Sequence, residues 1–106
     1  MFRDEVMYFE LAKTGEFEDL KKLIESGNFT ANDCNLTGIT PLHFAAERGD
    51  VDMAAYLVEN GADVNAYDDA GWRPIHVAAS HDKTDFVSFL VEKVFSCFLS
   101  SSYFFW

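Results

Sequence analysis

Basic residues are scarce in this sequence. Lysine and arginine together number 8 against 18 aspartates and glutamates, which gives a formal net charge of −10 at pH 7. Proteins that bind DNA or RNA neutralise phosphates with clustered Lys and Arg side chains, and no such cluster is present here. The composition therefore excludes nucleic acid as the expected partner and favours a basic or neutral protein surface.

Cysteine and recognisable catalytic motifs are equally sparse. Cys34 and Cys97 lie far apart and outside any C-x-x-C pair, so we expect reduced thiols rather than a disulfide framework or a zinc site. No serine or cysteine has a base at motif spacing, no glycine-rich phosphate loop is present, and the acidic stretches lack the spacing of a calcium loop. We expect no catalytic residue, no metal, no cofactor and no small-molecule substrate.

Long apolar runs are also missing. The most apolar stretch, residues 94–106, is shorter than the roughly 20 residues that a membrane-spanning helix needs. The first residues, 1–5, lead into mixed charges rather than into the apolar core of a signal peptide. We therefore expect a cytoplasmic protein, with a nuclear location still open, and membrane contact is the less favoured expectation.

An internal repeat is the strongest signal that is present. Moving the sequence along itself by 33 residues aligns 35–60 with 68–93 and gives nine identities without a gap, and a period in this range indicates a stacked array. A weaker copy precedes them, so we predict three units at about 1–34, 35–67 and 68–93, within a domain of residues 1–93. The nine pairs are Gly38/Gly71, Pro41/Pro74, His43/His76, Ala45/Ala78, Ala46/Ala79, Asp52/Asp85, Leu57/Leu90, Val58/Val91 and Glu59/Glu92.

Each unit is predicted to contain two short helices. In the middle copy Thr40 can cap a helix that has Pro41 at its first position, and Gly49 is placed to end it. A second helix follows, with apolar residues at helical spacing, and Gly61 stops it. The turn-forming run 62–71 then suits a hairpin-like link. The predicted fold class is all-α, a solenoid of about three helix-turn-helix units.

Residues 40–46, which read Thr-Pro-Leu-His-Phe-Ala-Ala, and 57–66, which read Leu-Val-Glu-Asn-Gly-Ala-Asp-Val-Asn-Ala, resemble the ankyrin repeat almost letter for letter. The third unit departs from the pattern, because Arg73 replaces the threonine and Asp82 the glycine that ends the first helix. The resemblance implies a non-catalytic module, a scaffold, adaptor or regulator, that binds another protein. It also implies that His43 and His76 are structural rather than metal ligands.

The same resemblance implies a concave contact surface made of hairpin tips and the exposed side of the first helices. Trp72 is our first choice as an anchor, because tryptophan dominates binding hot spots; the alternative is that it covers the adjacent hairpin. The implied contact positions are Leu36, Thr37, Ile39, Glu47, Arg48, Asp69, Ala70, Trp72, Ser80 and His81.

A narrower resemblance links residues 68–76 to ankyrin subunits that target protein phosphatase 1. Phe2 falls where the phenylalanine of their docking motif would lie, but the basic residue and the valine of that motif are absent. A regulatory or targeting subunit of a phosphatase is therefore the alternative hypothesis.

The tail at 94–106 departs from the family in kind, because it ends in aromatic residues instead of a polar cap. Three interpretations are open: an extension of the last helix, a membrane-interface or partner-docking segment, and a truncated or alternatively spliced form of a longer ankyrin protein. We favour truncation with partial helix extension, in which Phe86, Leu90, Val94 and Phe98 share one face.

Overall fold

Helices follow one another in pairs along the chain. The computed structural model describes the backbone of residues 2–102 and the side chains of residues 7–93. Within that part there are six helices and no strand, which confirms the predicted all-α repeat fold. The helices are α1 (Phe2–Thr14), α2 (Phe17–Glu25), α3 (Pro41–Arg48), α4 (Val51–Glu59), α5 (Pro74–Ser80) and α6 (Thr84–Ser102).

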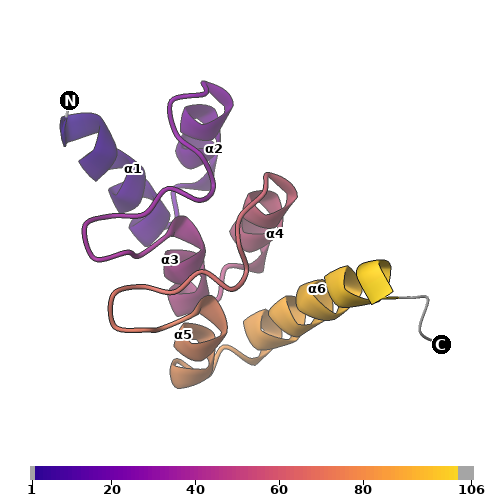
Figure 1. The fold of residues 1–106 in the computed structure, drawn as a ribbon. Coiled ribbons are helices and arrows are strands. Elements are labelled where there is room, and N and C mark those ends of the chain that lie inside the picture. The colour runs from indigo at the N-terminus through magenta and orange to yellow at the C-terminus, as the bar shows by residue number, and fades with distance from the viewer. Residues whose placement is uncertain (1, 103–106) are drawn as a thin grey trace.

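The pairs stack so that equivalent helices form layers. The first helices, α1, α3 and α5, lie side by side, and α2, α4 and α6 lie on the other side of the stack (Figure 1). The loops 26–40 and 60–73 project together on the side away from the second helices (Figure 1). The stack therefore presents loops and first helices on one surface, which is where the sequence placed the contact positions.

Local sequence sets the bounds of α3. The Thr40 hydroxyl accepts from the backbone N–H of His43, and Pro41 occupies the first turn, where no backbone donor is needed. Gly49 ends the helix at φ 78°, a left-handed conformation that favours a residue without a side chain. The chain turns at once into α4, where the Asp50 carboxylate caps the new helix by accepting from the Met53 N–H at 3.1 Å.

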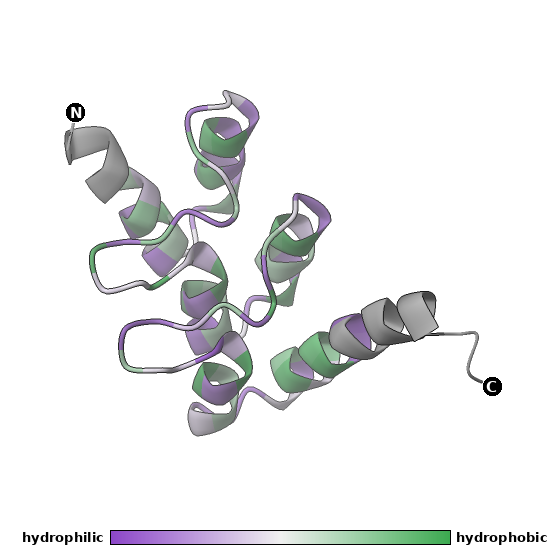
Figure 2. Cartoon of the chain, in the orientation of Figure 1, coloured by the Kyte–Doolittle hydropathy of each residue, from purple (hydrophilic) through white to green (hydrophobic). Residues whose placement is uncertain are grey.

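The core consists of apolar residues that recur at the repeat period. Small alanines of the first helices and larger side chains of the second helices belong to one buried cluster, and the small size of the alanines lets neighbouring units approach closely. Hydrophilic residues are prominent in the loops, whereas the helices carry alternating hydrophobic stretches (Figure 2). The fully buried apolar residues are Tyr8, Ala12, Leu20, Ala31, Leu42, Ala45, Ala46, Met53, Ala54, Leu57, Ala78, Phe86 and Leu90.

The last helix, α6, runs past residue 93, where we predict the last repeat unit to end. Phe86 and Leu90 are buried against the stack, and the helix continues to Ser102. The side chains of Val94 and Phe98, which we expect on the same face, lie outside the described residues. Among the helices that the structure describes, none is both long enough and apolar enough to cross a membrane.

The first helix of the third unit is followed by a residue with a strained backbone conformation. Asp82 has φ 58° and is the only non-glycine residue with a positive φ in the described chain. It stands at the repeat position of Gly49, so the fold imposes the left-handed turn there whichever residue is present. An aspartate tolerates this conformation better than most residues but less well than glycine.

Replacing Leu57 should test the repeat register. Leu57 is completely buried, so we expect Leu57→Ala to lower the free energy of unfolding by about 2–5 kcal/mol. Leu36 is fully exposed in a hairpin, and Leu36→Ala is the matched control, with an expected change within about 0.5 kcal/mol. Urea unfolding followed by circular dichroism measures both, and equal effects would contradict the register.

Replacing Asp82 should test the strain. Asp82→Gly should raise the free energy of unfolding by up to about 1 kcal/mol, because relief of the left-handed strain outweighs the extra freedom of glycine in the unfolded chain. Asp85→Gly in the first turn of α6 is the control and should lower it by about 0.5–1 kcal/mol. A lower melting temperature for Asp82→Gly would show that the turn is not strained.

Candidate functional site

The two projecting hairpins are held by side chains that fold back on their own backbone. Asn35 Oδ1 accepts from the N–H groups of Thr37 at 2.9 Å and Ile39 at 3.0 Å. In the next hairpin Asp68 Oδ1 accepts from the N–H groups of Ala70 and Trp72, both at 2.9 Å. These closed turns are the reason that short polar residues begin each tip, and they give the tips a fixed shape.

His43 joins the middle unit to the next hairpin. Its Nδ1 accepts from the Thr40 backbone N–H at 3.1 Å, so Nε2 carries the proton and donates to the Trp72 carbonyl oxygen at 2.7 Å. The imidazole is almost fully buried. A second link runs directly between the hairpins, from the Asp69 N–H to the Thr37 carbonyl oxygen at 2.9 Å. His43 therefore has the structural role that the family resemblance implies.

His76, the equivalent of His43 in the third unit, has no such hydrogen bond to a neighbouring hairpin within the described residues. His76 Nδ1 accepts from the Arg73 N–H at 3.2 Å, as His43 does from Thr40, but the ring is exposed. Arg73 cannot supply the capping hydroxyl that Thr40 provides. Its guanidinium instead donates from Nε to the Asn65 carbonyl oxygen at 3.1 Å and lies over the Tyr67 ring.

A groove of about 250 Å3 opens between the second hairpin and the helices α3 and α5. Half of the predicted contact positions line it: Ile39, Glu47, Trp72, Ser80 and His81. Trp72 is 43% exposed. A shallower cavity of about 560 Å3 lies on the other side of Trp72 and includes Ala70 and Ser80. Trp72 thus stands between two hollows of the same surface.

Four of the predicted contact positions are exposed on the hairpins: Leu36, Thr37, Asp69 and Ala70. Of these, only Ala70 lines either hollow. The Leu36 side chain is fully exposed, and nothing in the described part of the chain packs over it.

The groove also contains apolar residues that the sequence did not single out. Phe44 and Val77 occupy the same position in successive repeats, on α3 and α5, and both are half-buried. An apolar residue inside a helix is normally assigned to the core, so nothing marked them as surface residues. The repeat did contain a signal. In each unit the residue that follows, Ala45 or Ala78, is the one that is fully buried.

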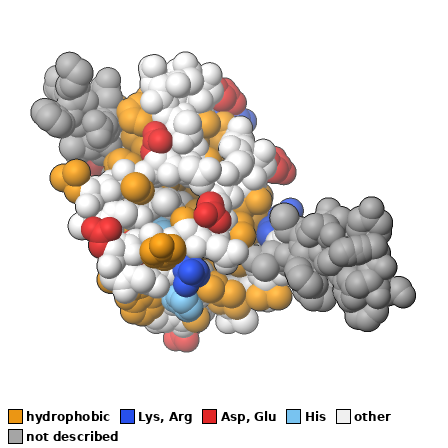
Figure 3. Space-filling view, viewed as in Figure 1, with side chains coloured by type: hydrophobic (Ala, Val, Ile, Leu, Met, Phe, Trp, Pro, Cys, Tyr) orange, Lys and Arg blue, Asp and Glu red, His pale blue; other side chains and the backbone are white. Residues whose placement is uncertain are grey.

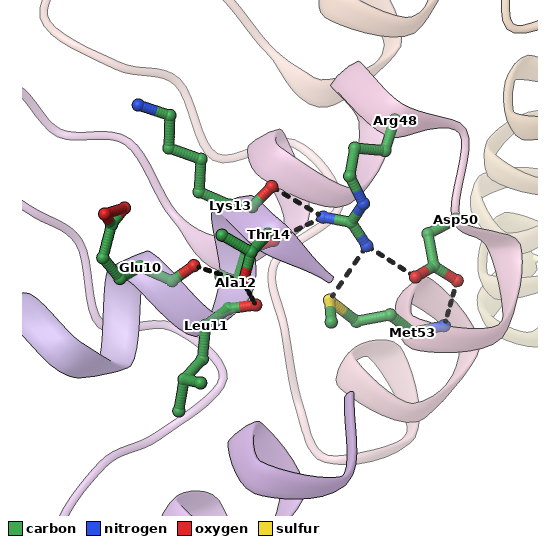
Figure 4. Close-up of polar contacts among 8 residues, drawn as sticks. All are labelled: Glu10, Leu11, Ala12, Lys13, Thr14, Arg48, Asp50 and Met53. Atoms are coloured by element: carbon green, nitrogen blue, oxygen red, sulfur yellow. Dashed lines mark hydrogen bonds and ion pairs between the residues drawn. The ribbon is translucent and has the colours of Figure 1, made fainter. Parts of the chain in front are cut away.

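Arg48 turns inward instead of toward the groove (Figure 4). Its Nη1 donates to the carbonyl oxygens of Ala12 and Lys13 at the end of α1, and its Nη2 donates to Asp50 Oδ2 at 2.5 Å. A cation there satisfies carbonyls that have no partner within α1 and opposes the negative end of that helix. The Arg48 guanidinium is thereby engaged in holding two units together.

Gly15 makes room for this contact. A Cβ atom at Gly15 would lie 2.9 Å from the Arg48 guanidinium carbon, and the residue has φ 88°. Both the left-handed turn and the close approach of the arginine therefore require glycine at the end of α1.

The described surface is acidic, in keeping with the composition. On the face in Figure 3, acidic side chains are scattered over several units and basic ones are few. Asp69 is exposed near the groove, and Glu47 and Asp68 line it.

Comparison with protein families gives one match, to the family described as ankyrin repeats (3 copies), over residues 9–100. The chain is 44% identical over 57 residues to the palmitoyltransferase akr1 of Emericella nidulans, which is 54% of this chain and 8% of that protein. It is 39% identical over 61 residues to alpha-latrocrustotoxin-Lt1a of Latrodectus tredecimguttatus, 58% of this chain and 4% of the toxin. It is 38% identical over 64 residues to 26S proteasome non-ATPase regulatory subunit 10 of Dictyostelium discoideum, 59% of this chain and 28% of the subunit.

Removing the charge of Arg48 should weaken the stack. We expect Arg48→Gln to lower the free energy of unfolding by about 1–3 kcal/mol, because charge-assisted hydrogen bonds at the end of α1 are lost. Arg73→Gln is the control. It also removes a guanidinium hydrogen bond, to the Asn65 carbonyl, and a cation-ring contact, but both lie within one exposed hairpin and should contribute about 1 kcal/mol or less. Urea unfolding compares the two, and an equal or smaller loss for Arg48→Gln would show that the guanidinium does not join the units.

Proposed function

We infer that this chain, which belongs to the ankyrin-repeat family, is a non-catalytic module that binds a partner protein on the surface made by its hairpins and by α3 and α5. Ankyrin repeats are protein-interaction modules, and the finer assignment of the surface is our proposal. The observation that supports this proposal best is the groove beside Trp72, which is lined by residues of both hairpins and of α3 and α5.

The size of the groove favours a protein side chain as its occupant. Pockets for small molecules usually have about 300–1,000 Å3 and bury most of the ligand. This groove, at about 250 Å3, lies just below that range, and the larger hollow on the other side of Trp72 is too shallow to enclose a ligand. A single apolar side chain of a partner suits such a space. The exposed hairpin positions Leu36, Thr37, Asp69 and Ala70 would then surround the central contact.

Trp72 has the properties of a binding anchor. Its side chain is partly exposed, while its backbone is fixed at both polar atoms, by Asp68 on the N–H and by His43 on the carbonyl. An anchor that is already ordered loses little conformational entropy on binding. This combination supports Trp72 as a contact residue over its alternative role as a cover for the hairpin.

The relatives support a role in binding rather than a shared activity. The palmitoyltransferase, the toxin and the proteasome subunit have different names. The chain spans only 8%, 4% and 28% of their respective lengths. What they share is the repeat. We therefore propose a scaffold, adaptor or regulator in the cytoplasm or nucleus, and assign no chemistry to the chain.

Two other hypotheses concern parts of the chain beyond the described side chains. Phosphatase targeting places a docking residue at Phe2, which begins α1 but whose side chain is not described. Membrane association relies on the aromatic residues 103–106, which lie outside the described residues. Neither has an observation in the described part of the structure that favours it over protein binding by the groove.

Trp72→Ala tests the proposed surface. We expect the helical circular dichroism to stay the same and the proteins captured from a lysate to fall at least tenfold in yield, since a hot-spot tryptophan contributes about 2 kcal/mol or more. Tyr67→Ala removes another exposed aromatic, outside the groove, and should leave the capture unchanged. Unchanged capture by Trp72→Ala, or a loss of cooperative unfolding, would assign the side chain a structural role instead.

A further inference from the structure

Two side chains face each other in the groove from different units. Glu47 belongs to α3, and His81 follows the end of α5. Their closest atoms, Glu47 Oε2 and His81 Nε2, are 3.8 Å apart, and both side chains are about half exposed, at 50% and 45%. The distance is too long for a hydrogen bond between them.

The other contacts of His81 determine where its proton lies. Ser80 Oγ donates to the Val77 carbonyl oxygen at 3.1 Å, so it can only accept from the imidazole. His81 Nδ1 lies 3.2 Å from that hydroxyl and 3.0 Å from the same carbonyl, and both are acceptors. In the neutral ring Nδ1 must therefore carry the proton. Nε2 is left as an acceptor, directed toward a carboxylate that is also an acceptor.

Such a pair of acceptors suits a cation with several N–H groups. A Lys ammonium has three donors and an Arg guanidinium has five, so either can donate to both atoms at once. The chain does not supply one from its described residues. No Lys or Arg in that part of the chain is within ion-pair distance of Glu47, and Arg48, the next residue, is bonded to Asp50.

The surroundings define the rest of the occupant. Ile39, Phe44 and Val77 give the groove an apolar lining next to Trp72, and Asp68, whose carboxylate closes the hairpin turn, also lines it. We propose that the groove binds a segment of a partner protein in which an apolar side chain is followed closely by Lys or Arg. The apolar side chain enters beside Trp72, and the cation bridges Glu47 and His81. This inference rests on the proposed function and adds the chemistry of the partner.

Selection of a random peptide library displayed on phage, with the whole chain as bait, tests the partner chemistry. We expect the enriched peptides to combine an aliphatic or aromatic residue with a nearby Lys or Arg. For a synthetic peptide of this kind, Glu47→Gln should raise the Kd by about tenfold to a hundredfold, the loss of a charged hydrogen-bonding partner. Glu59→Gln, an exposed position at the end of α4 outside the groove, removes the same charge and should leave the Kd within about twofold.

A double-mutant cycle assigns the contact to one pair. Replacing the peptide's Lys or Arg by Gln should weaken binding to the parent chain more than it weakens binding to Glu47→Gln, in which only His81 is left to accept from the cation. Equal losses for Glu47→Gln and Glu59→Gln would mean only general attraction to an acidic protein and would overturn the proposal.

Two outcomes separate this inference from the proposed function. Enriched peptides that lack cations, and whose binding falls with Trp72→Ala but not with Glu47→Gln, would overturn the cation and leave the binding surface in place. Basic peptides whose binding is insensitive to Trp72→Ala would overturn both, because neither the groove nor its rim would then make the contact.

Discussion

The hydrogen bond from His43 Nε2 to the Trp72 carbonyl is the contact on which the surface depends. A repeat cannot bury its apolar face alone, so apolar packing brings the units together but leaves their hairpins free to take several arrangements. A buried imidazole whose tautomer is fixed by Thr40 allows only one partner, an acceptor at a set place in the next unit. The Trp72 backbone is fixed in this way, and the groove acquires one wall of defined position.

Arg48 makes the equivalent connection at the other edge of α3. It reaches back to the end of α1, whereas His43 reaches forward to the next hairpin. The same repeat position in the third unit is His81, and there the supporting acid is absent because Lys83 stands where Asp50 does. His81 therefore bonds to its own helix through Val77 and leaves one ring nitrogen toward the groove. Two differences between the repeats, His81 for Arg48 and Lys83 for Asp50, therefore convert a position that joins units into one that lies beside the groove.

This difference shows what the sequence could and could not predict. The period, the helix caps and the buried alanines identify the fold, because local preference and stacking favour the same structure. The period also places Asp82 at the position of Gly49, where the structure has a positive φ. The direction of Arg48 and the exposure of Phe44 and Val77 depend on residues one repeat away, on the carbonyls of α1 and on the shape left beside Trp72. A pattern within one unit contains none of that information.

The placement of the groove between units has a consequence for stability. Its walls come from α3, from the second hairpin and from α5, so a segment bound there contacts two units at once. The third unit is less regular than the middle unit, because it lacks the capping threonine and has a strained helix stop at Asp82. A partner that binds only the correctly stacked form stabilises that form by mass action. Binding across the junction would therefore stabilise the unit in which Arg73 and Asp82 depart from the family pattern.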